Sequence, residues 1–175
     1  MPAAPYARDA VRMTTVVPYA NIAIGWRAAS RRGDVRVAAS GNGRGQIVID
    51  RTPASTFLIA MLSHRRARAD DRLPGTLNGV APGGLLARRG WVGDAVRTDG
   101  RRTGSRMWLL EDAKQTEATR QAAIQYLSES VGEIAADHRH DYSVAADWIA
   151  RGRLRATVVA YGVTVSTPVL VGGGA

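Results

Sequence analysis

The sequence predicts an α+β fold: an N-terminal β-meander, a helix, a long irregular loop, a long amphipathic helix and a C-terminal β-hairpin with an extended tail. The 175 residues include 19 glycines, which favour turns over a plain helical bundle. Apolar residues recur with a helical period in one late stretch and with a strand period in the next. The length suits one domain, which we place at 21–162, between an extended arm at 1–20 and an extended segment at 163–175.

Short apolar runs separated by turn residues predict the N-terminal strands. Residues 22–26, 34–38 and 47–49 are strand-like, and a glycine-rich turn at 40–45 precedes the last of them. Asn-Gly supplies the positive φ that tight hairpins need. This turn superficially resembles a phosphate loop, but it lacks the Gly-Lys-Ser/Thr ending and the following helix on which phosphate binding depends.

The first helix is expected to start at Thr52-Pro53, a hydroxyl cap followed by a residue whose missing N–H costs nothing at the first helical position. Leu58, Met61 and Leu62 repeat on one face of this helix. Residues 70–104 are then rich in glycine, proline and arginine, with little periodicity. A stretch of this length without regular structure is usually functional or held by a partner.

A second, longer helix follows a short apolar run at 105–111, which is itself able to open a helix. Thr116 is expected to cap the long helix, and glutamates are expected on its water-facing side: Glu117, Glu129 and Glu133. Its apolar stripe repeats at spacings of three and four and consists of Ile124, Leu127, Val131 and Ile134.

The C-terminal part alternates like strands. Residues 142–148 and 154–161 form the expected hairpin around the turn Arg151-Gly152. Residues 163–171, interrupted by Pro168, are also extended. The sequence leaves open whether they pair within the chain or with a neighbouring chain.

Composition excludes several classes of function. The chain has no cysteine, which excludes disulfides, thiolate ligands and cysteine nucleophiles. No apolar run reaches the roughly 18 residues of a membrane helix, and no signal peptide is visible. The pair His138-x-His140 is too few for a zinc site, which normally has three protein ligands. Nothing gives Glu111, Asp112 or the helix glutamates a raised pKa for acid catalysis. We expect no enzyme, no cofactor and no bound metal.

The net charge of +9 comes from 24 basic and 15 acidic residues, and it is unevenly distributed. Residues 1–110 are basic, 111–150 acidic and 151–175 basic again. This layout suits contacts with charged protein neighbours, and it also leaves a nucleic-acid-binding protein as the alternative. Among the arginine pairs, only Arg88-Arg89 has an aromatic neighbour, and no recognition helix is visible. We therefore expect no specific nucleic acid partner.

Several motifs in order resemble one phage family over residues 22–162. Residues 55–74 are similar to a helix and its basic exit in the Mu-type baseplate wedge protein family. Arg89-Gly-Trp-Val-Gly-Asp94 resembles the family's Gly-Trp-Trp-Gly-Asp signature, and Gly104–Leu110 with Lys114-Gln-Thr116 resembles its next block. That family is in turn similar to the sheath-initiator, or lysozyme-like baseplate wedge, family of contractile tails.

The resemblance implies a structural component of the baseplate wedge of a contractile phage tail, which joins wedge neighbours and helps nucleate the tail sheath. It places the protein in the virion, at the tail baseplate, after synthesis and assembly in the host cytoplasm. The implied partners are other wedge proteins, the sheath protein and central hub or tube proteins, with multiple copies in a sixfold assembly and no membrane. A tail-associated cell-wall hydrolase is a further alternative, although these residues do not support the lysozyme-like label.

Two sets of residues are the candidate contacts. Tryptophan and arginine are typical anchors of protein interfaces, and an unpaired edge strand accepts a strand from a neighbouring chain. The predicted protein interface consists of Arg88, Arg89, Gly90, Trp91, Gly93, Asp94, Arg101, Arg102, Arg106 and Trp108. The predicted sheet for strand augmentation contains Leu154, Ala156, Val158, Ala160, Val163 and Val165.

Overall fold

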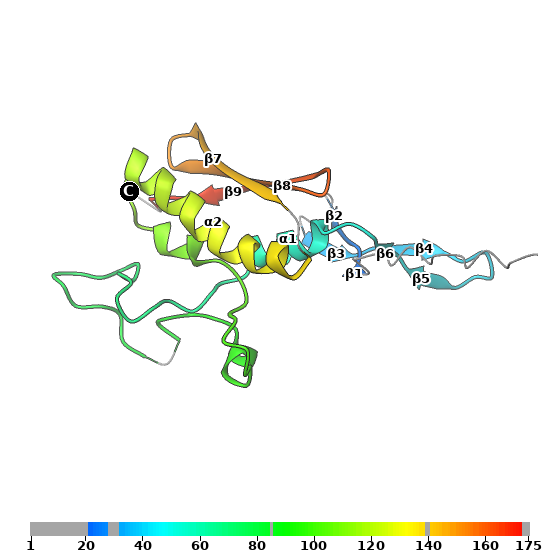
Figure 1. Cartoon of the computed structure of the whole chain (residues 1–175), viewed down its shortest axis with the longest axis horizontal. Coiled ribbons are helices and arrows are strands. Elements are labelled where there is room, and N and C mark those ends of the chain that lie inside the picture. Colours follow the sequence, from blue (N-terminus) through cyan, green and yellow to red (C-terminus); the bar gives the residue numbers. More distant parts are fainter. Residues whose placement is uncertain (1–20, 28–31, 85, 139–140, 173–175) are drawn as a thin grey trace, which may run out of the picture.

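The computed structural model describes residues 21–27, 32–84, 86–138 and 141–172 (Figure 1). The predicted arm, residues 28–31, His140 and the end of the tail lie outside the described residues. The described chain combines helices with small antiparallel sheets, which confirms the predicted α+β class.

A three-stranded antiparallel sheet forms the C-terminal half of the core. It consists of β7 (Tyr142–Ala150), β8 (Arg153–Ala160) and β9 (Val163–Leu170), in the order β7-β8-β9. The extended segment beginning at Val163 therefore pairs within the chain, directly after a two-residue turn at Tyr161 and Gly162. Both turn residues have positive φ, 55° and 70°, as a tight type I′ hairpin requires.

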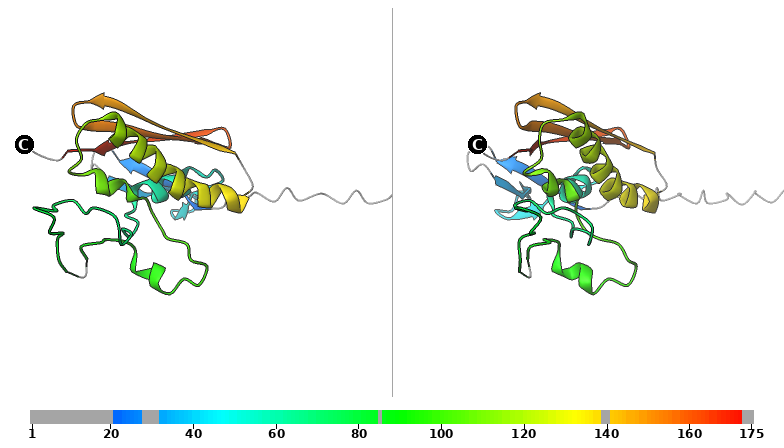
Figure 2. Two further views of the ribbon diagram at one scale, coloured as in Figure 1. Left: turned by 60° about the vertical axis from the view of Figure 1, so that its left-hand side comes forward. Right: turned by 90° about the vertical axis from the view of Figure 1, so that its left-hand side faces the viewer.

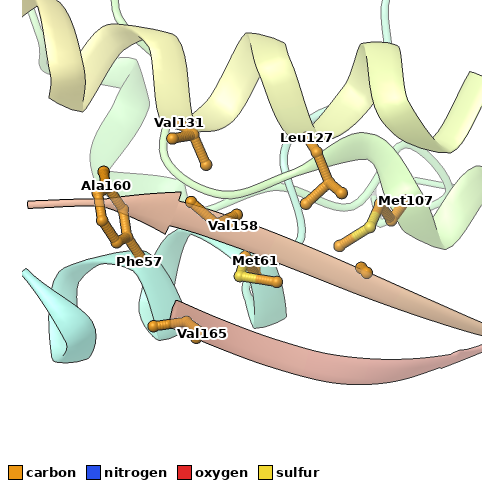
Figure 3. Packing of buried hydrophobic residues seen from close by; sticks show 9 residues of the cluster. Phe57, Met61, Met107, Leu127, Val131, Val158, Ala160 and Val165 are labelled. Atoms are coloured by element: carbon orange, nitrogen blue, oxygen red, sulfur yellow. The ribbon is translucent and has the colours of Figure 1, made fainter. Parts of the chain in front are cut away.

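Both helices cover the same face of this sheet (Figure 2). The long helix α2 (Glu117–His138) packs on β7 and β8, while α1 (Ala54–Leu62) packs on α2 and β9. The predicted stripe of α2 faces inward, and Leu127 and Val131 are fully buried against Val158 (Figure 3). Thr116 caps α2 as expected, since its hydroxyl accepts a hydrogen bond from the amide of Thr119 at 3.2 Å.

The inward face of α1 includes Met61, as predicted, but it differs from the prediction at the two leucines. Phe57, Ala60 and Met61 are buried, whereas Leu62 is 60% exposed and Leu58 is only partly buried. The sequence interpretation placed Leu62 on the core face because it followed Leu58 by four residues. The helix in fact turns Phe57 into the core, where it meets β8 and β9 (Figure 3).

The hydroxyl of Thr52 accepts a hydrogen bond from the amide of Ala54 at 3.3 Å, as expected of a cap, and Asp50 adds further contacts at this end of α1. The carboxylate of Asp50 accepts hydrogen bonds from the amide of Ser55 at 3.2 Å, from the Ser55 hydroxyl at 2.8 Å and from the Thr52 hydroxyl at 2.7 Å. Burial acts to raise the pKa of Asp50, but these hydrogen bonds hold it below its usual value. A carboxylate at this end is also favoured by the helix dipole.

The predicted irregular loop is present. Between α1 and α2 the chain forms only two 3-10 turns, η1 (Val92–Ala95) and η2 (Arg106–Leu110), and two isolated bridges among the described residues. The second turn is the apolar run expected to open a helix, and all five of its residues are buried. The loop lies along the helices on the side away from the sheet (Figure 1).

The N-terminal strands are antiparallel, as in the predicted meander, but they form three separate two-stranded ribbons instead of one sheet. The first ribbon joins β2 (Ile24–Arg27) to β3 (Arg32–Val35), and the second joins β4 (Val37–Ala39) to β5 (Gly45–Ile47). The third closes the unit by pairing β1 (Asn21–Ile22) with β6 (Ile49–Asp50). Each predicted strand is split because its residues belong to two ribbons.

Candidate protein interface

The Gly-Trp-Val-Gly-Asp motif forms a tight turn whose glycines are required by close contacts. Gly90 has a φ of 102°, and a Cβ there would lie 2.6 Å from the Cβ of Arg66 and 2.9 Å from its Cα. The ring of Trp91 covers Gly93, where a Cβ would lie 2.4 Å from the indole. The motif therefore packs its own backbone and presents Trp91, which is 56% exposed.

Asp94 fastens this turn to the end of the loop. Its side chain is buried, and the carboxylate accepts hydrogen bonds from the amide of Thr103 at 3.0 Å and from the Thr103 hydroxyl at 3.0 Å. Arg102 donates to the carbonyl oxygen of Asp94 at 3.0 Å. These hydrogen bonds tie Asp94, at the start of the segment 94–103, to Arg102 and Thr103 at its end.

A buried ionic network joins the loop to α2. The side chain of Arg106 is 5% exposed and donates to Asp71 at 2.7 Å and to Glu129 at 2.8 Å. Its guanidinium also lies 4.7 Å from the ring centre of Tyr126, a cation–π geometry. Burial acts to lower the pKa of Arg106, but the two carboxylates raise it overall. Arg68 adds a 2.6 Å contact with Glu129.

Two acids expected to face water therefore belong to this network. The side chain of Glu129 is 20% exposed, and Glu133 accepts from Arg65, whose side chain is 5% exposed. The interpretation of a solvated polar face is wrong for Glu129, because the loop packs its arginines over that side of α2, while the side chain of Glu133 stays 34% exposed. Burial acts to raise the pKa of Glu129, but the hydrogen bonds from Arg106 and Arg68 lower it.

Other predicted interface arginines also have partners within the chain. Arg89 binds Glu111 through two 2.6 Å contacts and lies 4.5 Å from the ring centre of Trp108. Arg101 forms a two-pronged pair with Asp137 at the end of α2. Arg88 donates to the backbone carbonyl oxygens of residues 68 and 69. These side chains hold the loop in place.

An apolar groove lies between α1 and the loop. It has a volume of about 740 Å³ and is lined by Ile59, Leu62, Leu86 and Trp91, together with polar loop residues. These four side chains are between 48% and 81% exposed. Exposed apolar side chains gathered in one place are typical of protein contact sites. The groove brings the predicted Trp91 together with three residues that sequence analysis missed.

A second groove of about 680 Å³ lies on the other side of Leu62 and His64 and reaches the end of β9 at Leu170. Its floor includes Trp108, which is buried and donates its indole N–H to the carbonyl oxygen of Arg65 at 2.8 Å. Burial and the charge of Arg89 lower the pKa of His64. The end of α1 is therefore a ridge between two grooves.

The open edges of the C-terminal sheet lie on β7 and β9. Most of the predicted augmentation residues lie on β8, which is paired on both sides and has no free edge: Leu154, Ala156, Val158 and Ala160. Their side chains are buried in the core. Only Val163 and Val165 are on an edge strand, and their side chains face inward.

The two edges are not equally available. Along an antiparallel ladder, hydrogen-bonded residue pairs alternate with non-hydrogen-bonded pairs. Counted along β8 and β9 from the turn at 161–162, Pro168 and Arg155 form a non-hydrogen-bonded pair. The nitrogen of Pro168 therefore faces the open edge, where it removes a donor. On β7 the outward carbonyl oxygen of Ala146 accepts from Arg120 of α2 at 3.1 Å. Free N–H groups remain on β9 at Thr164 and Ser166.

No group of three or more metal-ligating side chains occurs among the described residues. In the same part of the chain, no helix combines the length and apolar character needed to cross a membrane. The prominent features are apolar grooves and an open strand edge, which define an α+β protein suited to contacts with other chains.

Comparison with known proteins identifies the family. Residues 53–167, from the start of α1 to the middle of β9, match the family described as phage protein GP46, and the chain belongs to this family. The chain is also 35% identical over 97 residues to the baseplate protein gp46 of Escherichia phage Mu. That match covers 51% of this chain and spans 60% of the Mu protein. Both findings confirm the resemblance to the Mu-type baseplate family.

Proposed function

We propose that this protein is a structural, non-enzymatic subunit of a phage tail baseplate. The observation that carries this proposal is the rigidly held Trp91 turn beside the apolar groove on α1. The relative in phage Mu is a baseplate protein, which supports the same role. Within such an assembly the groove receives a side chain or segment of a neighbouring wedge subunit, with hub or tube proteins as further neighbours.

The loop supports this role because its arginines fix it before any partner binds. Arg89, Arg101 and Arg106 are all bound to carboxylates of the same chain. A preorganised surface loses less conformational entropy on binding. The same pairing weakens the nucleic-acid alternative, since these guanidinium groups are not free to contact phosphates. Arg106 and Trp108 are buried and belong to the support, while Trp91 is the exposed anchor.

The interface is tested with Trp91→Ala in particles assembled from otherwise unchanged proteins. We expect the yield of complete tails, counted by electron microscopy, to fall at least tenfold while the melting temperature of the isolated variant changes little. Leu77→Ala is the matched control, because Leu77 is also exposed but lies outside the groove. A normal tail yield from Trp91→Ala would count against the interface.

We further propose that the sheet helps nucleate a contractile sheath by accepting a strand at the first half of β9. Thr164 and Ser166 supply the outward donors, and Pro168 ends the usable edge. Ser166→Pro removes an outward N–H and no backbone hydrogen bond between β8 and β9, so it should reduce sheath attachment. It also removes the 3.0 Å hydroxyl contact of Ser166 with Thr157, and Ser166→Ala, which loses that contact and keeps the N–H, should attach the sheath normally. Pro168→Thr is the control and should have no such effect. Unchanged sheath attachment with Ser166→Pro would refute this part of the proposal.

A further inference from the structure

Two segments of the loop run side by side and bring several arginines together beside α2. The amide of Arg65 donates to the carbonyl oxygen of Ser105 at 3.0 Å, and the amide of Ser105 donates to that of Ser63 at 2.9 Å. Gly104 permits this approach, because a Cβ there would lie 2.5 Å from the carbonyl oxygen of Ser63. Residues of both segments line a pocket of about 560 Å³ with two glutamates of α2. We call it the arginine pocket.

The arginine pocket holds more positive charge than the chain neutralises. Five arginines and two glutamates line it. Three of the arginines form ion pairs with carboxylates of the chain: Arg65, Arg68 and Arg106. The other two, Arg66 and Arg102, are exposed and form no ion pair with any residue that the structure describes. The pocket therefore has two guanidinium groups available to an anion.

Arg65 adds a buried donor to the wall of the same pocket. Its side chain is 5% exposed, and one of its terminal nitrogens binds Glu133. The other terminal nitrogen, Nη1, is buried, lies 3.6 Å from Glu129, and has no hydrogen-bond partner among the described residues. Buried donors are nearly always paired in folded proteins. This unpaired donor is a second observation, independent of the two free charges, that indicates an acceptor at this pocket.

The Gly-Trp-Val-Gly-Asp motif positions both free arginines. Gly90 brings the motif against Arg66, since a Cβ at Gly90 would lie 2.6 Å from the Cβ of Arg66. At the other end of the motif, Asp94 accepts from the amide of Thr103 at 3.0 Å, and its carbonyl oxygen accepts from Arg102 at 3.0 Å. Groups that are held before a partner arrives lose less conformational entropy on binding.

The carboxylates in the wall determine which anion fits. Guanidinium groups bind both carboxylates and phosphates through paired N–H donors. Nucleic acid, however, is bound by cations that follow its backbone. In the arginine pocket, Glu129 and Glu133 are 20% and 34% exposed, so they repel a string of phosphates. One acidic side chain brings a single charge, which the two free arginines more than balance.

We infer that the arginine pocket binds an aspartate or glutamate side chain of a different protein in the particle. This inference rests on the proposed baseplate role. The incoming carboxylate pairs with Arg66 and Arg102 and supplies an acceptor for Nη1 of Arg65. A second copy of this chain is a poor source of it, because each copy carries a net charge of +9 and like charges repel. The contact is polar and separate from the apolar groove beside Trp91.

Zero-length cross-linking in assembled tails tests this inference. The chain contains one lysine, Lys114, so an amine introduced as Arg66→Lys or Arg102→Lys is readily distinguished when a carbodiimide joins amines to carboxylates in direct contact. We expect coupling, identified by mass spectrometry, to an aspartate or glutamate of a different protein. Arg151→Lys is the matched control, because Arg151 is exposed but outside the pocket, and it should not couple to that residue. Coupling to Glu133 alone, to a second copy or to nothing would overturn the inference.

Neutral substitution gives an independent readout. Arg66→Gln with Arg102→Gln removes both free charges and leaves the ion pairs of the other three arginines in place. We expect incorporation of this double variant into tails to fall at least fivefold with a nearly unchanged melting temperature, whereas Arg151→Gln should incorporate normally. Normal incorporation of the double variant would overturn the inference. Binding of duplex DNA by the isolated protein, lost in the double variant, would also overturn it by assigning the pocket to phosphates. Absence of the unaltered protein from tails would instead refute the proposed function, and this inference with it.

Discussion

Arg106→Ala should destabilise the protein by about 3 kcal/mol, because it breaks a buried ionic network. The side chains of Arg106, Asp71 and Glu129 are 5%, 12% and 20% exposed, so their charges are poorly solvated. Breaking a buried ion pair typically costs about 3–5 kcal/mol. We expect the lower end of that range, because Glu129 keeps its contact with Arg68 and Asp71 keeps a hydrogen bond from the Arg68 amide.

Urea unfolding of the isolated chain measures this loss, which corresponds to a fall in melting temperature of roughly 6–12 °C for a chain of this size. Arg97→Ala is the control: it removes an exposed pair with Asp99, and such pairs are worth about 1 kcal/mol or less. A loss of less than about 0.5 kcal/mol with Arg106→Ala would refute the conclusion that the network holds the loop on α2.

The pH dependence gives an independent check on the same network. The pKa of Glu129 is lowered in the folded protein: burial opposes this, and the hydrogen bonds from Arg106 and Arg68 outweigh burial. A carboxyl group whose pKa is lower in the folded than in the unfolded protein stabilises the fold at any pH above its unfolded-state pKa. This stabilisation is lost as the pH falls through its folded-state pKa. Unfolding free energies measured downward from pH 5 should therefore fall more steeply for the unaltered protein than for Arg106→Ala. Parallel curves would contradict this.

Three further predictions concern the loop and the cap of α1. Gly90→Ala should lower the free energy of unfolding by about 3 kcal/mol, because it adds a clash with Arg66 to the strain of a positive φ. Gly79→Ala, in open space, should lower it by about 1 kcal/mol, which is the strain alone. Urea unfolding measures both, and equal losses would refute the close-approach argument. Asp94→Ala should increase hydrogen exchange at the Thr103 amide and cost about 2 kcal/mol, and unchanged exchange there would contradict the clamp. Asp50→Ala should cost about 1 kcal/mol, and this difference should vanish as the pH falls below 3.8, since the pKa of Asp50 is lowered against the opposing effect of burial.

Periodicity made much of the core predictable. The stripe that includes Leu127 and Val131 follows the helical repeat without interruption, and residues 142–161 alternate through a short turn. These patterns are local, and burial on one face is their direct cause. The exposed side chain of Leu62 escaped the same reasoning, because α1 is short and both of its faces carry apolar residues.

The ionic network was not predictable from the sequence. Arg106 lies 35 residues from Asp71 and 23 from Glu129, and nothing local indicates that the loop returns to α2. The separation of basic and acidic stretches was interpreted as a means of meeting charged neighbours. In the folded chain, much of this charge instead joins the loop to the helix. The split was therefore a signal of long-range pairing within the chain.

The three N-terminal ribbons meet where the backbones of Ala23, Arg36 and Val48 hydrogen-bond to one another in a ring. This junction separates the length of each ribbon from the rest of the fold. Strand pairs added at the tip of a ribbon would lengthen it by about 3.4 Å each and would leave Ala23, Arg36 and Val48 in place. The stem formed by β1 and β6 would remain attached to α1. Insertions and deletions in the ribbons are therefore the simplest way for this architecture to change its reach while keeping its core constant.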